Sequence, residues 1–221
     1  MSTEITLVSE VNSMMAADSS RMTPTKMKHQ VAITEVRNSG VIVANLGTVA
    51  MAAGESFELK FEGSGALSRV IVSAATINTL VENKNAVRAP GGLIILSAKS
   101  ASRLQSGVVN NTGILEAEGL VRRAGRILLE ASSSILNSGA IQADASTGSD
   151  AGPTGTITLS APDVQNTGTL SATNLAANSF PESTSLAPLA AEVGRIQIQA
   201  DTFSQTSTGL LDVSAVALQA G

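Results

Sequence analysis

Two seven-residue patterns alternate along most of this chain, and they constrain its fold more than any other feature. One has the form Gly-x-Ile-x-Leu-x-Ala, and the other has the form Asn-Thr-Gly-x-Leu-x-Ala. Copies of the first begin at Gly47, Gly92, Gly125, Gly155 and Gly194. Copies of the second begin at Asn38, Asn83, Asn111, Asn137, Asn166 and Ser207. Internal repetition of this kind is typical of solenoids, in which each repeat packs mainly against its neighbours.

Each copy of the first pattern is typical of a short strand. In GTITLSA, Ile157 and Leu159 alternate with Thr156 and Thr158, the period of two expected of a strand with one buried face. Aligning the copies gives columns of equivalent residues: Val49, Ile94, Ile127, Ile157 and Ile196; Met51, Leu96, Leu129, Leu159 and Ile198; Ala53, Ala98, Ala131, Ala161 and Ala200; and, from the second pattern, Ile42, Val87, Leu115, Ile141, Leu170 and Leu211. Strands this short bury their apolar faces by stacking in parallel about 4.8 Å apart. The sequence therefore predicts an all-β fold, a parallel β-helix or β-solenoid.

Asparagine and glycine recur where each repeat would change direction. Asparagine opens most copies of the second pattern, where it tolerates unusual dihedral angles and can bond local backbone. Glycine takes the third position, where a corner between strands would require a positive φ. The predicted structural corner residues are Asn38, Asn83, Asn111, Asn137, Asn166, Gly40, Gly113, Gly139 and Gly168.

The spacing between the patterns predicts the domain organisation. Residues 1–37 contain no copy and are expected to form an N-terminal cap or arm, whereas residues 38–221 form the parallel β-helix. An extra-helical insertion is expected at residues 54–82, because FELKF and VIVS are typical of a hairpin. A short helix is expected near residues 74–82, at the end of this insertion.

Two late loops leave one corner of the predicted β-helix. They cover residues 144–154 and 173–193 and are rich in Ser, Ala, Asn, Gly and Pro. Because the repeats explain most other positions, specific recognition is expected in these loops. The candidate binding residues are Asp144, Asp150, Asn174, Asn178 and Phe180.

Composition argues against several classes of function. The net charge of −4 argues against a nucleic-acid surface. The chain has no Cys and a single His, His29, so disulfides, thiolate metal sites and a Ser-His-Asp triad on the repeats are not expected. We predict no cofactor and no metal. No apolar stretch is long enough for a membrane span, and residues 1–30 do not have the pattern of a secretory signal.

Three stretches carry a resemblance to a known family. They are NSGVIVANLGTVAMAAG (residues 38–54), LVENKNAVRAPGGLIILSAKSA (residues 80–101) and VVNNTGILEA (residues 108–117). These stretches resemble the filamentous-haemagglutinin type exoproteins of bacterial two-partner secretion. The resemblance implies a right-handed β-helix that is extracellular or on the bacterial cell surface, and that serves adhesion, aggregation or contact-dependent competition.

The chain also departs from that family. The family's secretion domain usually starts with a signal peptide and contains NPNL and NPNGI motifs, and this sequence contains no Asn-Pro-Asn. Asn85 stands where the family commonly has a corner glycine, which we attribute to the tolerance of asparagine for left-handed backbone. The chain is expected to begin inside the secretion domain or to be a short relative. A partner transporter in the outer membrane is expected for the full-length protein.

Three functional hypotheses follow. The first is a non-enzymatic adhesin-type fragment that contacts host or bacterial surface glycans or proteins. The second is a self-assembling filament subunit, a homo-oligomer formed by end-to-end stacking, because uncovered strand edges favour further pairing. The third is a polysaccharide-acting enzyme with clustered carboxylates, for which Glu116 and Glu130 are the candidates, although isolated surface carboxylates are ordinary. Arg122, Arg123 and Arg126 form either a patch for anionic glycans or a solubilising turn.

Overall fold

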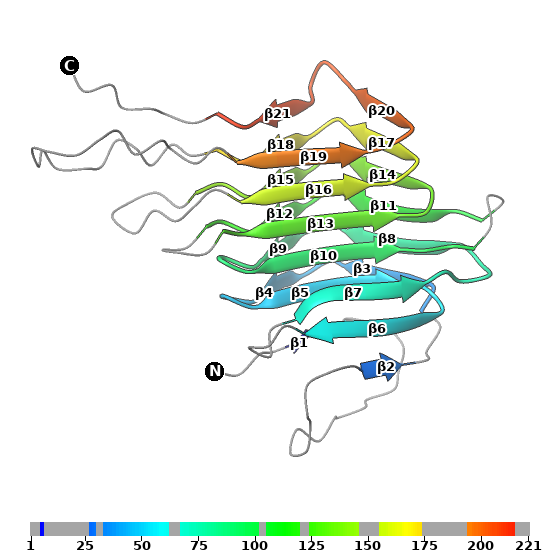
Figure 1. Ribbon diagram of the computed structural model, residues 1–221. Coiled ribbons are helices and arrows are strands. Elements are labelled where there is room, and N and C mark those ends of the chain that lie inside the picture. Colours follow the sequence, from blue (N-terminus) through cyan, green and yellow to red (C-terminus); the bar gives the residue numbers. More distant parts are fainter. Residues whose placement is uncertain are drawn as a thin grey trace, which may run out of the picture.

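The computed structural model describes residues 5–6, 27–29, 33–61, 67–101, 105–119, 124–145, 155–173 and 194–214. These residues form β-strands and their connections, with no helix among them. The strands belong to three six-stranded sheets, in which all pairs are parallel, and to one antiparallel sheet of three strands. Figure 1 shows the parallel strands stacked one above another from the N-terminal to the C-terminal end.

We name the parallel sheets I, II and III. Sheet I contains β1 (Ile5–Thr6), β5 (Thr48–Ala53), β10 (Leu93–Ala98), β13 (Arg126–Ala131), β16 (Thr156–Ser160) and β19 (Arg195–Gln199). Sheet II contains β3 (Glu35–Asn38), β8 (Thr79–Asn83), β11 (Gly107–Asn111), β14 (Ser134–Asn137), β17 (Asp163–Asn166) and β20 (Thr202–Gln205). Sheet III contains β4 (Val41–Val43), β9 (Ala86–Arg88), β12 (Ile114–Glu116), β15 (Ala140–Gln142), β18 (Thr169–Ser171) and β21 (Leu210–Asp212).

The chain visits the sheets in a fixed rotation, from II to III to I and then back to II. One such set of strands is called a rung here, and each strand pairs in parallel with its equivalents in the neighbouring rungs. This arrangement is consistent with a β-helix or solenoid. The prediction of an all-β fold with stacked parallel strands is therefore confirmed.

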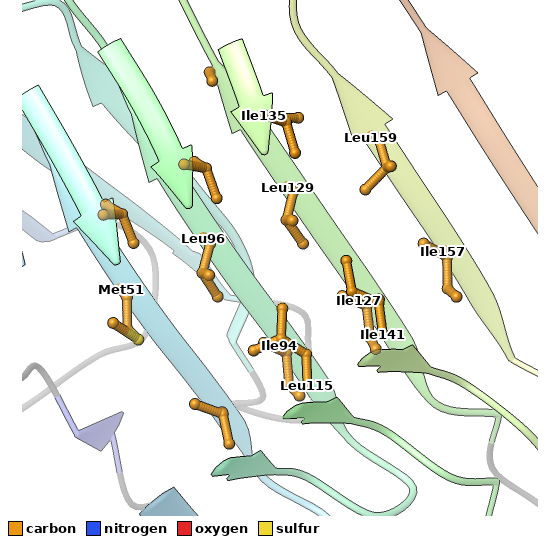
Figure 2. Close-up of a cluster of buried hydrophobic side chains, with 14 of the residues drawn as sticks. Met51, Ile94, Leu96, Leu115, Ile127, Leu129, Ile135, Ile141, Ile157 and Leu159 are labelled. Carbon is orange, nitrogen blue, oxygen red and sulfur yellow. The ribbon is translucent and has the colours of Figure 1, made fainter. Parts of the chain in front are cut away.

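The strand register confirms the predicted columns of apolar residues. Leu129 pairs with Leu96 below and Leu159 above, and Leu115 lies between Val87 and Ile141. Leu96, Leu115 and Leu129 are fully buried in one core cluster, which Figure 2 shows as side chains that point inward from facing strands. Each fully buried side chain of this size contributes about 1.5–3 kcal/mol of hydrophobic stabilisation. Stacking thus supplies the core that no single rung could form.

Sheet II contains a third class of strand, which the two heptad patterns do not predict. Each of its strands contributes one inward apolar residue. This residue stands two positions before the asparagine that ends the strand, or before Gln205 in β20. These residues are Val36, Val81, Val109, Ile135, Val164 and Phe203. The first rung begins at Glu35, so the expected boundary after residue 37 falls inside β3.

A hairpin covers the outer face of sheet I in the first two rungs. β6 (Ser56–Phe61) and β7 (Leu67–Ser73) pair antiparallel as predicted, and β2 (Met27–His29) pairs with β6. Phe57, Leu59 and Val70 pack on outward residues of β5 and β10, including Ala50 and Ile95. This contact explains why the first two copies of the strand pattern are apolar at outward positions.

The end of the expected insertion differs from the prediction. Residues 79–83 are not helical but form β8, which pairs in parallel with β3 and β11. The insertion therefore ends before β8. The alternating burial from Thr79 to Val81 matches a strand with one face inward.

Candidate functional site

The predicted corner asparagines lie inside the molecule and bond to one another. The Nδ2 atom of each donates to the Oδ1 atom of the next, at 2.8 Å from Asn38 to Asn83, 2.9 Å from Asn83 to Asn111, 2.8 Å from Asn111 to Asn137 and 2.8 Å from Asn137 to Asn166. None of the five exposes more than 5% of its surface. We call this row the asparagine ladder. It satisfies buried amides along the stack, so these residues are structural and cannot contact a partner directly.

Glycine at the corner between sheets II and III is predicted to supply a positive φ, and this prediction is wrong. Among the described residues, the only glycine with positive φ is Gly91, and neither Asn85 nor the ladder residues have positive φ. A Cβ atom at Gly139 or Gly168 would lie 2.0 Å from the carbonyl oxygen of the glycine one rung below, and one at Gly113 would lie 2.0 Å from that of Asn85. These glycines are required by close backbone approach between rungs. Gly40, in the first rung, has no such contact.

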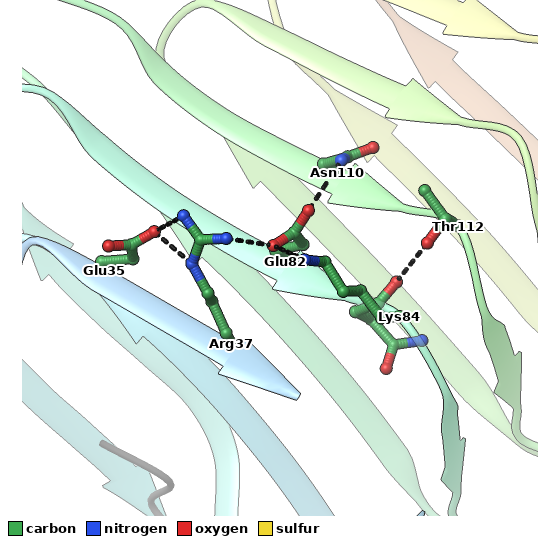
Figure 3. Close-up of polar contacts among 7 residues, drawn as sticks. Glu35, Arg37, Glu82, Lys84, Asn110 and Thr112 are labelled. Atoms are coloured by element: carbon green, nitrogen blue, oxygen red, sulfur yellow. Dashed lines mark hydrogen bonds and ion pairs between the residues drawn. The ribbon is translucent and has the colours of Figure 1, made fainter. Parts of the chain in front are cut away.

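A charged network lies on the outer face of sheet II (Figure 3). Glu82 is only 8% exposed. Its carboxylate accepts hydrogen bonds from Arg37 at 2.9 Å and from Asn110 at 3.3 Å. The Nζ atom of Lys84 lies 3.2 Å from the Oε2 atom of Glu82. Arg37 also pairs with Glu35. The carboxylate of Glu82 is held by Arg37 and Asn110 from the two neighbouring strands, β3 and β11, and by Lys84, which follows β8. The network therefore ties the first rungs together, and its two cations balance the charge of Glu82.

The corner between sheets III and I is built to accept connections of different length. In each rung the connection leaves after an alanine and returns at a glycine, and we call this position the loop corner. Its connections are residues 45–46, 90–91, 118–124, 144–154 and 173–193. The amide of the returning glycine donates to the carbonyl of the departing alanine at Gly47, Gly92 and Gly155, at 2.9–3.0 Å. A Cβ atom at Gly125 or Gly194 would lie within 2.0 Å of the alanine carbonyl oxygen. The ends of each connection therefore lie side by side whatever its length.

Positive φ values occur in the two shortest connections at the loop corner, and not at the corner between sheets II and III where the sequence predicts them. Leu46 has φ 55° and Gly91 has φ 62°, and both directly precede the returning glycine. A two-residue connection thus turns by placing its second residue in the left-handed region.

Acidic side chains lie beside the loop corner, where the strands of sheet III end. Glu116 lies 3.3 Å from Arg88 of the rung below. Burial raises the pKa of Glu118, and the nearby charges of Glu116 and Asp144 raise it further, whereas Arg88 acts in the opposite direction. The edge of this corner therefore concentrates negative charge next to the points where the loops leave.

Asp144 is the one predicted binding residue that lies within the described part of the chain. Its Oδ1 atom accepts bonds from the Ser171 hydroxyl at 2.6 Å, the Thr173 amide at 2.7 Å and the Thr173 hydroxyl at 2.9 Å. Asp144 thus binds the start of the connection in the next rung, at Thr173, and stabilises the loop corner. The other candidates, Asp150, Asn174, Asn178 and Phe180, lie outside the described residues.

The residues considered for polysaccharide chemistry do not come together. Glu116 is on β12 of sheet III and Glu130 is on β13 of sheet I, where it pairs with Lys99. Arg126 is exposed at the start of β13, and Arg122 and Arg123 lie outside the described residues. Across the described ranges, no group of three or more His, Cys, Asp and Glu side chains is placed to hold a metal ion. No helix among those same residues has the length and apolar character to cross a membrane.

Comparison with the models of known protein families finds none that matches this chain, and comparison with curated proteins finds no significant match. The resemblance to filamentous-haemagglutinin type exoproteins therefore remains a prediction from the sequence.

Proposed function

We propose that this chain is a non-enzymatic binding scaffold of the adhesin type, which displays recognition loops from one corner of a rigid β-solenoid. The observation that carries the proposal is the loop corner. The close backbone contact between the departing alanine and the returning glycine is repeated in successive rungs. The connection between them lengthens from residues 45–46 to residues 173–193. Variable loops on a rigid framework are a common way to present binding residues.

The proposal includes a closed, right-handed β-helix. The fixed rotation of the chain through sheets II, III and I supports closure, and a right-handed crossover is the general rule for parallel strands in one sheet. The resemblance to two-partner exoproteins supports the same hand. It also supports an extracellular or cell-surface location, with an outer-membrane transporter as the partner of a longer protein.

The proposed partners are glycans or proteins on host or bacterial surfaces. The negative charge of Glu116, Glu118 and Asp144 beside the loops favours partners that offer cationic or hydroxyl groups. The outward rows of sheet I in the later rungs, such as Thr156, Thr158 and Gln197, are polar and half-buried. They suit broad, weak contacts better than capture of a small molecule in an enclosed pocket.

A loop-replacement experiment tests this function. Replacing residues 174–193 by a single glycine would leave Ala172-Thr173-Gly-Gly194, which reproduces the closure seen from Ala89 to Gly92 and keeps the Thr173 contacts to Asp144. We expect the variant to fold normally and to lose at least about tenfold in affinity for bacterial or host cell surfaces or for arrayed glycans.

The matched control shortens a loop elsewhere. Replacing residues 62–66, which connect β6 and β7, by a two-residue Asn-Gly turn is expected to leave surface binding unchanged. Equal binding by the corner variant and the parent chain would refute the proposed role of the loop corner. Turnover of a polysaccharide by the purified chain, abolished by Glu116→Gln or Glu130→Gln, would instead establish an enzyme.

A further inference from the structure

We propose that the outer face of sheet I in the later rungs binds a linear acidic polysaccharide with one carboxylate per disaccharide. The surface concerned lies on β13, β16 and β19 and is called the polar face here. Its outward residues include Arg126, Thr156, Thr158, Ser160, Arg195 and Gln197. The inference rests on the proposed function, because it names the class of glycan and the surface that such a glycan contacts.

The polar face lies beyond the area that the hairpin covers. In the first two rungs, outward residues of sheet I such as Ala50 and Ile95 are buried under β6 and β7. Strands β13, β16 and β19 follow β10 in sheet I, on the far side of the hairpin in Figure 1. On these strands Arg126 and Arg195 are exposed, and Thr158 is half-buried. The outer face of sheet I is therefore accessible in the later rungs.

The middle of the polar face is a grid of hydroxyl and amide groups. Thr156 pairs in register with Arg195, and Thr158 pairs with Gln197, so polar side chains of neighbouring strands lie side by side. The side chains of Thr156, Thr158, Ser160 and Gln197 make no hydrogen bond within the part of the chain that the structure describes. Hydroxyl and amide groups both donate and accept hydrogen bonds, as sugar hydroxyls do. The grid therefore offers hydrogen-bonding partners to a sugar chain that lies across the strands.

Two arginines stand at equivalent positions of this grid. Arg126 and Arg195 both pair with Thr156, which lies between them. Neighbouring parallel strands are about 4.8 Å apart, so the two arginine positions are separated by about 9.6 Å. Successive carboxylates have a similar spacing in an extended polysaccharide with one acidic sugar per disaccharide. Because a guanidinium group can hold a carboxylate with two parallel hydrogen bonds, the pair matches the charge pattern of such a ligand.

These arginines differ from those of the other two sheets in having no ionic partner. Arg37 of sheet II and Arg88 of sheet III each form an ion pair with a glutamate. Arg126 and Arg195 form no ion pair and no side-chain hydrogen bond with any described residue. Each of them directly follows the glycine at which a connection returns to sheet I. Two uncompensated positive charges are thus placed where the loop corner meets the polar face.

No unpaired carboxylate on the three strands opposes an acidic ligand. Their only acidic side chain is Glu130, which forms an ion pair with Lys99. Asp201 comes after the end of β19, at the opposite edge of the face from Arg195. The acidic side chains beside the loop corner lie at the ends of the sheet III strands, on the other side of that corner. The polar face therefore attracts a carboxylate at its arginine edge.

Calorimetric titration of the full chain with a hyaluronate oligosaccharide tests the inference, because hyaluronate carries one carboxylate per disaccharide. Its methyl ester, which has the same sugars without the charge, is the matched ligand. We expect the acid to bind, the ester to bind at least about tenfold more weakly, and added salt to weaken binding of the acid. Binding of the ester as tightly as the acid would contradict recognition of the carboxylates.

Two double variants locate the site. Arg126→Gln combined with Arg195→Gln is expected to weaken hyaluronate binding at least about tenfold. The control combines Lys60→Gln with Arg69→Gln, which removes the same charge from two exposed residues that face each other on the hairpin, and it should leave binding unchanged. Equal weakening by the two double variants would show a general charge effect and overturn the proposal.

Nuclear magnetic resonance gives a readout that separates this site from the loop corner. On titration with hyaluronate, amide signals of residues 156–160 should shift, whereas those of residues 163–166 in sheet II of the same rung should not. A parent chain that binds cell surfaces through residues 174–193 but shows no shifts with hyaluronate would refute this inference and leave the proposed function intact. Loss of hyaluronate binding in the arginine variant, with cell binding dependent on the loop, would support both.

Discussion

Leu129→Asp is expected to lower the free energy of unfolding by about 4 kcal/mol or more, because it buries an unpaired carboxylate in the apolar stack. Leu129 is fully buried and pairs with Leu96 and Leu159, which are also fully buried. The charge would therefore face apolar side chains in both neighbouring rungs. Urea denaturation followed by circular dichroism measures the change.

The neighbouring residue provides the control for this variant. Leu128 lies on the same strand but points to the outer face and is only half-buried, so Leu128→Asp should cost no more than about 1 kcal/mol. Equal losses for the two substitutions, or an unchanged cooperative transition for Leu129→Asp, would contradict the assignment of inward and outward faces.

Asn111→Ala is expected to destabilise the chain by about 2–4 kcal/mol, because it breaks the asparagine ladder at its centre. It removes the acceptor of the Asn83 amide at 2.9 Å and the donor to Asn137 at 2.8 Å. Since all three residues are at most 3% exposed, water cannot replace either bond without opening the stack. The same denaturation experiment measures the loss.

Asn110→Ala is the matched control for the ladder. Asn110 is adjacent, half-buried and outward, and makes a 3.3 Å bond to Glu82. Its removal should cost less than about 1 kcal/mol. If the two variants were equally stable, the ladder would contribute nothing beyond ordinary surface hydrogen bonds.

The apolar columns could be predicted from sequence because each heptad contains its own period of two. Ile157, for example, is identified as inward by its neighbours Thr156 and Thr158 alone. The strands of sheet II carry a weaker signal, because each contributes a single inward apolar residue. In all but β20 this residue stands two positions before an asparagine, as in Val81-Glu82-Asn83 and Val164-Gln165-Asn166. The recurrence of that spacing would have revealed the third strand in each rung.

Other features depend on contacts between rungs and were not accessible to local reasoning. Turn chemistry predicts positive φ for a corner glycine, whereas Gly139 is fixed by the carbonyl oxygen of Gly113 below it. The same limit applies to the asparagines, whose partners lie 26 or more residues away in sequence. The acidic edge of the loop corner likewise joins Glu116, Glu118 and Asp144 from two rungs.

Side-chain amide hydrogen exchange tests the stacked solenoid most directly. In the native chain, the Nδ2 hydrogens of Asn83, Asn111 and Asn137 should exchange only through opening of the stack, and therefore at least about a thousandfold more slowly than those of unprotected amides. Asn78, which is exposed, provides the internal control in the same nuclear magnetic resonance spectrum. Slow exchange confined to the ladder would support the stack, whereas exchange at Asn111 as fast as at Asn78 would contradict it.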